Sequence, residues 1–440
     1  MANPTIALIV DCSGSMTWYN YLDYAKTDAA TFANIMQIGD GCCVVSFSDS
    51  AYLNQALITL TSQNITSVCT NIQSIHSVDM TNISAGIQLA NQQIGSSASP
   101  HGMVLLSDGM WNEGVDPMTV LPNNIPIYTI ALGDHGELDI MQRIATATSG
   151  TYNYAPGYRE LARIYNNIAA QTQVAEVVRN SLDSVQPLYY KEYTTNITAG
   201  ISMGTFTLNW DNINVAYTPN TPTGNQINIV LYDPNNNKFT GSPVYVASGS
   251  VVFEVANPIP GNWTVGCWYA GTAGTPALDC TWGTFEPPGT AALSLTSASQ
   301  LLSAGEEPQI EVHFHDYENP IKNPIIRATV SAPQHSYESI AQNYAKELQE
   351  IIPDENLMKD GVPEDKARIS ALNQKMNGTL LTRHDRPLFN VTTGTDGKHA
   401  IKLTDTAISG TYNVHVEATG YSTRHKSMVQ RTGIISIHVK

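Results

Sequence analysis

Short apolar runs alternate with longer segments of helical periodicity along the first part of the chain, up to about residue 175. The apolar runs are 6–10, 42–47, 103–106 and 125–132, and the helical segments are 21–36, 83–94, 138–148 and 158–178. Such alternation is typical of parallel strands covered by helices on both faces. We therefore predict an N-terminal α/β domain over residues 1–178. Its sheet should be parallel, doubly wound and Rossmann-like, with ligands at the carboxyl ends of the strands.

Beyond residue 178 the pattern changes to alternating strands separated by turns. Turn-rich segments such as 233–237 and 257–262 predict an antiparallel β-sandwich over residues 179–288. Glu286-Pro287-Pro288-Gly289 has the composition of a short, stiff linker. A second β-sandwich is predicted over residues 289–440. It is interrupted near 336–377 by a charged segment of helical spacing, which we interpret as a helical insertion that packs over a sheet edge or carries an interaction surface.

The chain is acidic, since 22 Lys and Arg residues against 38 Asp and Glu residues give a formal net charge of −16 at pH 7. Nucleic-acid backbones and anionic membranes repel such a chain, so neither is a predicted partner. No apolar run approaches the roughly 18 residues that cross a bilayer, and no transmembrane segment is predicted. The first apolar run is too short for a signal peptide, which indicates a cytoplasmic protein as written. The protein is extracellular or at the cell surface if a signal was removed or if export is non-classical.

Six cysteines in a chain of this length do not form a dense disulfide framework. The four in the first third have the pattern of small buried residues, and we expect free thiols there; they are Cys12, Cys42, Cys43 and Cys69. Cys267 and Cys280 flank a Gly-, Thr- and Pro-rich stretch and would meet across a hairpin. The sequence leaves open whether these two form a disulfide.

Three polar segments of the first domain lie at ends of predicted elements. Asp11, Ser13 and Ser15 follow the first strand, Thr81 precedes a helix, and Asp108 ends a central strand. Because the carboxyl ends of parallel strands meet at one edge of a sheet, we expect these side chains to converge in one crevice. Two carboxylates and three hydroxyls are hard oxygen donors, which suit Mg²⁺, Mn²⁺ or Ca²⁺ and do not suit zinc or copper. Taken alone, the first three residues also fit a helix N-cap.

The order and spacing of these five residues resemble the metal-ion-dependent adhesion site of von Willebrand factor A domains, which integrin I domains also contain. Ser-Asp-Gly at 107–109 and Ile-Ala-Leu-Gly at 130–133 strengthen the match, which covers about the first 175 residues. The later segments 257–265 and 409–414 resemble strands of extracytoplasmic and immunoglobulin-like β-sandwiches. The order of the units is similar to the later part of calcium-activated chloride-channel regulators and to bacterial A-domain surface proteins.

The resemblance implies that Ser13, Ser15 and Thr81 coordinate the ion directly, while Asp11 and Asp108 hold it largely through water. Mg²⁺ is then the first expected cation. An ion bound mainly by neutral hydroxyls keeps a vacant position for an Asp or Glu carboxylate of a protein partner. We therefore expect metal-dependent protein–protein binding or cell adhesion.

No Ser/His/Asp hydrolase signature, phosphate-binding glycine loop or Cys/His nucleophile pair stands out, so we expect no enzyme activity. The alternatives are a structural or scaffolding subunit, in which the metal mainly fixes loops, and, less favoured, an enzyme cofactor subunit. His313 and His315 share a strand face without an evident third ligand, and we interpret them as surface or packing residues. The segment 134–137 is interpreted as the N-cap of the next helix.

Overall fold

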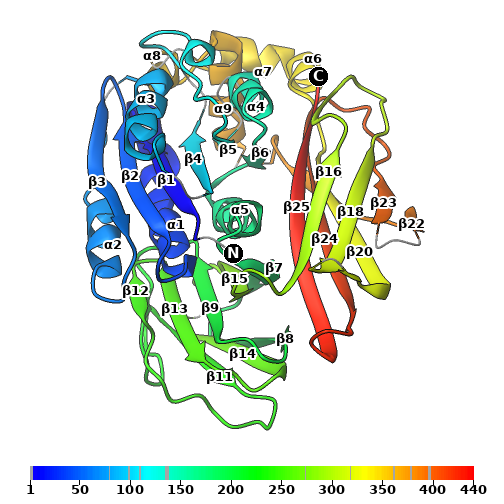
Figure 1. Ribbon diagram of the computed structural model, residues 1–440. Helices are drawn as coiled ribbons and strands as arrows, with labels where there is room; N and C mark the ends of the chain where they lie inside the picture. The colour runs from blue at the N-terminus through cyan, green and yellow to red at the C-terminus, as the bar shows by residue number, and fades with distance from the viewer. Residues whose placement is uncertain are drawn as a thin grey trace.

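The computed structural model describes residues 3–440 except 79, 98–99, 109–110, 134–137, 273, 318, 360–361, 377–378 and 395–397. Gly109 and the N-cap predicted at 134–137 lie outside the described residues. Figure 1 shows an α/β unit, two stacks of β-sheets and a group of helices at one end. We name these parts in chain order: the α/β domain (3–171), the first sandwich (176–286) and the second sandwich (291–439), whose helical insertion spans 337–375.

The α/β domain contains a six-stranded sheet with the strand order β3-β2-β1-β4-β5-β6. Its strands are β1 (Thr5–Asp11), β2 (Gly41–Phe47), β3 (Ala51–Thr59), β4 (His101–Ser107), β5 (Ile127–Leu132) and β6 (Tyr152–Ala155). The sheet is mixed and not wholly parallel as predicted, because β3 runs antiparallel to β2. Only residues 48–50 connect these two strands, and a parallel pair needs a crossover of a dozen residues or more.

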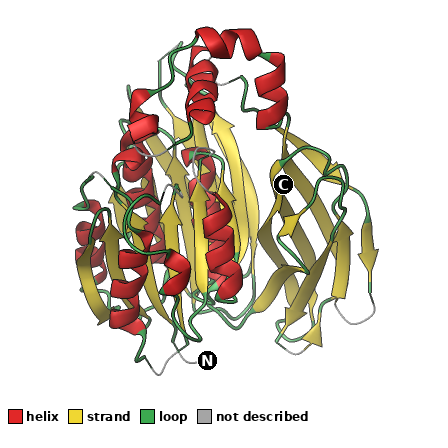
Figure 2. Cartoon of the chain, turned by 90° about the horizontal axis from the view of Figure 1, so that it is seen from above, coloured by secondary structure: helices red, strands yellow, loops and turns green. Residues whose placement is uncertain are grey.

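Helices cover both faces of this sheet (Figure 2). They are α1 (Tyr21–Ile35), α2 (Ile65–Gln73), α3 (Ile83–Ile94), α4 (Leu138–Ala147), α5 (Tyr158–Gln171) and the short 3₁₀ turns η1 (Gly14–Asn20) and η2 (Pro117–Thr119). Alternate residues of β1 face opposite sides: Leu8 packs with α1, α2 and α5, and Ile9 packs with α3 and α4. The helix predicted at 158–178 ends at Gln171, because Gln173 has a left-handed backbone (φ 60°) and a strand begins at Glu176.

The first sandwich packs a four-stranded sheet (β10-β11-β14-β8) on a five-stranded sheet (β12-β13-β9-β15-β7). Its strands are β7 (Glu176–Val185), β8 (Tyr190–Ile197), β9 (Met203–Trp210), β10 (Ala216–Tyr217), β11 (Gln226–Tyr232), β12 (Tyr245–Ala247), β13 (Ser250–Ala256), β14 (Gly261–Tyr269) and β15 (Leu278–Glu286). Cys267 and Cys280 lie in opposite sheets of this core and not across one hairpin, and all six cysteines are buried free thiols.

The second sandwich packs the sheet β16-β18-β23-β22, with β19 paired to β18, on the sheet β17-β25-β24-β20-β21. Its strands are β16 (Ala291–Ser297), β17 (Leu301–Leu302), β18 (Gln309–Asp316), β19 (Asn319–Pro320), β20 (Lys322–Pro333), β21 (Arg383–Leu388), β22 (Val391–Thr393), β23 (Lys398–Lys402), β24 (Gly410–Ser422) and β25 (Ser427–Val439). Between the paired strands β20 and β21 lie α6 (Tyr337–Asn343), α7 (Ala345–Glu350), α8 (Glu355–Lys359) and α9 (Glu364–Lys375).

The first sandwich contacts the α/β domain through α1. Asn209 Nδ2 donates to Asp28 Oδ1 at 2.7 Å, and the hydroxyl oxygens of Thr31 and Ser250 lie 2.7 Å apart. Burial raises the pKa of Asp28 well above its ordinary value, which favours the neutral acid at this interface. Phe285 of the first sandwich belongs to the same core cluster as β1 and α1. The hydrophobic core of the α/β domain therefore continues into its neighbour.

The second sandwich covers the outer edge of β6. Asn413 Nδ2 donates to the carbonyl of Tyr154 at 2.9 Å, and the Tyr154 N–H donates to Ser436 Oγ at 3.0 Å. The Asn167 side chain bonds both backbone groups of Ile434, at 2.9 and 2.8 Å. The bonds from Asn413 and Ser436 satisfy backbone groups of the edge strand β6, which would otherwise be open to pairing with another chain.

A buried ion pair joins the two sandwiches. Arg431 Nη2 lies 2.6 Å from Glu286 Oε2, and the two side chains are 1% and 0% exposed. Arg431 also donates to Thr290 Oγ1 at 2.7 Å and to the carbonyls of Gln430 and Ala291. Glu286 Oε1 accepts from the Thr198 N–H at 2.7 Å. Glu286, predicted to begin a short, stiff linker, is thus a buried residue that ends β15.

No helix in the described part of the chain is both long enough and apolar enough to cross a membrane.

We predict that Arg431→Met lowers the free energy of unfolding by about 3–5 kcal/mol, because Glu286 would stay buried without its partner. The double variant Arg431→Met/Glu286→Leu should recover most of that loss, since no uncompensated charge remains. Urea unfolding followed by tryptophan fluorescence measures both, with the exposed Arg327→Met as the control. A single variant as stable as the wild type would contradict this account of the ion pair.

Burial and the neighbouring Glu286 carboxylate raise the pKa of Glu176, whereas Arg431 lowers it. The net result is a pKa of about 7 for Glu176. Because this pKa lies above the ordinary value, the folded state binds the proton more tightly than the unfolded chain does. The stabilisation is fully present below about pH 4.5 and is lost as the pH rises through 7, a change of about 3 kcal/mol. Glu176→Gln should flatten the pH dependence of the melting temperature between pH 4.5 and 7.5, whereas the exposed Glu192→Gln should leave it unchanged.

Candidate metal site

Asp11 ends β1 and organises the loop that follows it. Its Oδ1 accepts a hydrogen bond of 2.8 Å from the Ser13 N–H, a local turn in which aspartate is favoured. The hydroxyl oxygens of Ser13 and Ser15 lie 3.0 Å apart, and all three side chains are fully buried. Ser13 occupies the N-cap position of η1, but its side chain makes no capping hydrogen bond. The alternative interpretation of this sequence as a helix cap is therefore not what the structure contains.

The end of β4 lies beside the end of β1, because the two strands pair in parallel with Val10 opposite Leu106. Ser107 Oγ donates to Asp11 Oδ2 at 2.6 Å, and the next residue, Asp108, is only 2% exposed. Two buried carboxyl-bearing residues thus follow neighbouring strands, as expected where parallel strands end.

The loop that carries Thr81 is fastened to the same edge. The Val78 N–H donates to the carbonyl of Cys12 at 2.9 Å, and Ser77 Oγ donates to the carbonyl of Ser13 at 3.1 Å. Thr81 is 1% exposed, and its N–H donates to Asn112 Oδ1 at 2.9 Å. Its neighbour Asn82, and not Thr81, caps α3 by accepting from the Ala85 N–H at 3.0 Å.

The five residues predicted as metal ligands are thus all buried at the carboxyl edge of the sheet, on three loops linked by hydrogen bonds. Hydrogen bonds join Asp11 to Ser13 and Ser13 to Ser15. Thr81 and Asp108 are placed by the backbone bonds and strand pairing of their own segments.

Burial raises the pKa of Asp11 to about 6, and the hydrogen bonds from Ser107 and Ser13 only partly offset the cost of desolvation. Among the described residues no Lys, Arg or His side chain forms an ion pair with Asp11. A cation at this edge would supply the counter-charge that the carboxylate lacks. The buried oxygen donors therefore fit a hard divalent cation.

Sequence reasoning missed two supporting residues. Ser107 was identified only as part of a motif, whereas its hydroxyl holds Asp11; Asn112, which holds Thr81, carries no recognisable signal in a chain rich in asparagine. In the part of the chain that the structure describes, no group of three or more His, Cys, Asp or Glu side chains is arranged to hold a metal. His313 Nε2 instead lies 3.3 Å from Glu311 Oε2.

Residues 6–110 match the sequence model of the von Willebrand factor type A domain, and the N-terminal domain is of this type. No curated protein matches the chain. A von Willebrand factor type A protein from Catenulispora acidiphila has a similar structure, with 16% identity and a TM-score of 0.38 over 72% of this chain and 63% of that one. The chain therefore spans less than two thirds of the length of that protein.

Two further structures are similar. Proximal thread matrix protein 1 of the mussel byssus, with a zinc-occupied metal-ion-dependent adhesion site, has 15% identity and a TM-score of 0.34 over 46% of this chain and 51% of that one. The von Willebrand factor domain of the type V pili tip protein Mfa5 from Porphyromonas gingivalis has 15% identity and a TM-score of 0.31, over 38% and 94%. All three TM-scores lie below 0.5, so none of these similarities bears on the function of this chain.

We predict that the protein binds Mg²⁺ or Mn²⁺ reversibly and that Asp108→Ala weakens this binding at least tenfold. Oxygen sites with few direct charges hold these ions weakly. Removing one of only two carboxylates should therefore lower the metal affinity strongly. Titration calorimetry on the full chain measures the affinity, with the exposed Asp385→Ala as the control. Equal metal binding by wild type and Asp108→Ala would reject the assignment of this residue.

Proposed function

We propose that this protein, whose N-terminal domain is a von Willebrand factor type A domain, is a non-enzymatic protein that binds a partner through a divalent cation. Ser13, Ser15 and Thr81 would hold the ion directly, and Asp11 and Asp108 would hold it largely through water. The observation that carries the proposal is the Asp11 carboxylate, fully buried without an ion-pair partner in the described structure and next to two hydroxyls that cap no helix.

The charge balance of this donor set accounts for the binding step. Three neutral hydroxyls and two more distant carboxylates compensate the charge of a divalent cation only in part. A partner that offers an Asp or Glu carboxylate at the open position adds a charge-assisted contact in a site largely shielded from water. The first choice of ion is Mg²⁺, and Mn²⁺ or Ca²⁺ would bind the same donors. The bound ion would attract the partner carboxylate, and the ligand residues would fix the position of the ion.

The surface around this edge suits a protein partner. Val78 and Met80, which flank the loop of Thr81, are 40% and 37% exposed, and Val115 is 55% exposed. Residues 112 and 113 bond the backbone carbonyl of Thr81, so the strand β4 loop and the Thr81 loop form one rim. Exposed apolar side chains beside a polar site favour a partner that presents its carboxylate between apolar residues.

A structural or scaffolding role is the second candidate, and the tight docking of the α/β domain on both sandwiches favours it. In that case the cation would mainly fix the three loops, and partner binding would not depend on it. The two roles differ in one measurable respect, the effect of removing the metal on association.

Thr81→Ala should abolish most partner binding while the fold remains intact. The substitution deletes one hydroxyl ligand and one buried methyl group, so the stability cost should be about 1 kcal/mol. Peptides selected from a random display library against the wild type in Mg²⁺ should be enriched in Asp and Glu. They should lose at least tenfold in affinity in EDTA and toward Thr81→Ala.

The matched control for this experiment is Thr66→Ala, at an exposed threonine in the first turn of α2 that is not among the predicted ligands. It should retain both its melting temperature and its peptide affinity. Peptides that bind the wild type, the EDTA-treated protein and Thr81→Ala equally well would reject metal-mediated binding and favour the scaffolding role.

A further inference from the structure

The segment between the metal loop and α1 has an unusual backbone. η1 contains Ser15 and ends at Asn20, and its helical turn is interrupted at Trp18, which is extended (φ −69°, ψ 142°). Tyr19 and Asn20 are left-handed, with φ of 51° and 58°. Asparagine tolerates this conformation, but for tyrosine it costs roughly 1–2 kcal/mol and persists only where neighbouring contacts hold it.

Those contacts come from the helical insertion of the second sandwich. Gln374 Nε2, on α9, donates to Tyr19 Oη at 2.7 Å, and Ser370 Oγ lies 3.5 Å from the same atom. The ring of Trp18 packs on a cluster of three buried residues of the insertion: Leu357, Val362 and Ala367. Residues about 350 positions apart in the chain thus meet next to the predicted metal loop.

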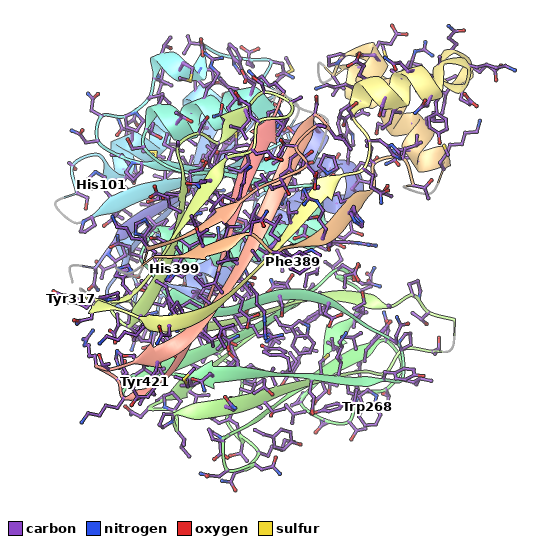
Figure 3. The ribbon with its side chains drawn as sticks, turned by 90° about the vertical axis from the view of Figure 1, so that its right-hand side faces the viewer. His101, Trp268, Tyr317, Phe389, His399 and Tyr421 are labelled. Atoms are coloured by element: carbon purple, nitrogen blue, oxygen red, sulfur yellow. The ribbon has the colours of Figure 1, made fainter. Side chains whose placement is uncertain are left out.

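The insertion is built to act as one body. Arg368 of α9 donates to the carbonyls of Leu348 and Ile351, at 3.0 and 2.5 Å, which ties α7 to α9. A second small core lies between α6, α9 and the chain that follows. Figure 3 shows the four helices gathered at one corner of the molecule, outside both sheets of the second sandwich. A change in the position of this group would therefore be transmitted to Trp18 and Tyr19 together.

The two residues that link the ligand loop to Trp18, Met16 and Thr17, are held by hydrogen bonds to that loop. The Met16 N–H donates to the carbonyl of Ser13 at 3.2 Å, and Thr17 Oγ1 donates to the carbonyl of Gly14 at 2.7 Å. Only two residues separate Ser15 from Trp18, and both are held by these bonds. The position of the Trp18 ring therefore restricts where the hydroxyls of Ser13 and Ser15 can lie.

We propose that the helical insertion positions the metal loop of the α/β domain, so that its docking on Trp18 and Tyr19 raises the affinity of the site for a divalent cation. The inference rests on the proposed function, because it assigns positioning residues to the same site. By linkage, a bound cation strengthens the docking of the insertion by the same factor. The helical insertion, which is far from the metal loop in sequence, would thereby influence the affinity for the partner.

The decisive variant leaves the α/β domain unchanged. Ala367→Glu places a carboxylate against Trp18 and should undock α8 and α9, whereas Ala371→Glu makes the same change at a partly exposed position of the same helix. Two readouts are needed on the full chain: Mn²⁺ affinity by titration calorimetry, and hydrogen exchange of residues 14–20 with and without Mn²⁺. A purely structural contact would change the melting temperature and leave the affinity unaltered.

We expect Ala367→Glu to lose exchange protection over 14–20 and to bind Mn²⁺ at least fivefold more weakly than Ala371→Glu. Gln374→Ala removes only the bond to Tyr19 and should lower the Mn²⁺ affinity about twofold relative to Lys375→Ala, its exposed neighbour. This variant tests the inference if Ala367→Glu does not fold. Unchanged Mn²⁺ affinity in Ala367→Glu, with or without loss of protection, overturns the inference and leaves the proposed function standing. A wild type that binds no Mn²⁺ overturns the proposed function, and the inference with it.

Discussion

The position of the Asp11 carboxylate constrains much of the α/β domain. It ends a strand that is buried on both faces, so its charge can be compensated only at the carboxyl edge of the sheet. The surrounding loops supply what neutral groups can: a backbone N–H from Ser13 and a hydroxyl from Ser107. These bonds do not fully offset desolvation, so the pKa of Asp11 stays raised. The ionised carboxylate is therefore buried without a counter-charge, which is unfavourable. The chemistry of this edge fits a cation, which would supply the missing counter-charge.

The junction between the two sandwiches lies away from this edge. The first sandwich contacts α1, and the second sandwich covers the outer edge of β6. The Arg431–Glu286 ion pair lies where the chain passes from one sandwich to the next. Pro287 and Pro288 of that passage line a cavity with Pro4 and Pro100, which precede β1 and β4. The junction therefore lies at the amino ends of the strands, opposite the predicted metal site, whereas the helical insertion packs on Trp18 and Tyr19 beside that site.

The sequence predicted the parts of this fold that repeat a local pattern. Alternating apolar runs and helical segments predicted the α/β domain correctly, because the pattern of each strand or helix is contained within a few neighbouring residues. The antiparallel β3 was missed, since this edge strand is partly exposed along its whole length and lacks an apolar run. The end of α5 was placed too late because Val174 and Val177 continue its apolar spacing, and the left-handed Gln173 that ends it has no sequence signature. The clustering of Asp11, Ser13 and Ser15 followed from their spacing, whereas the supports Ser107 and Asn112 depend on contacts between loops.

The insertion marks the limit of local reasoning more clearly. Its charge and helical spacing indicated helices, but nothing in residues 337–375 indicates that Trp18 closes one of their cores. Conversely, Tyr19 reads as an ordinary residue before a helix, and its left-handed backbone makes physical sense only with Gln374 in place. A contact between such distant residues depends on the native packing of both units, which must offset the entropy of closing so long a loop. The conformation beside the predicted metal loop is therefore a property of the assembled chain and not of the α/β domain alone.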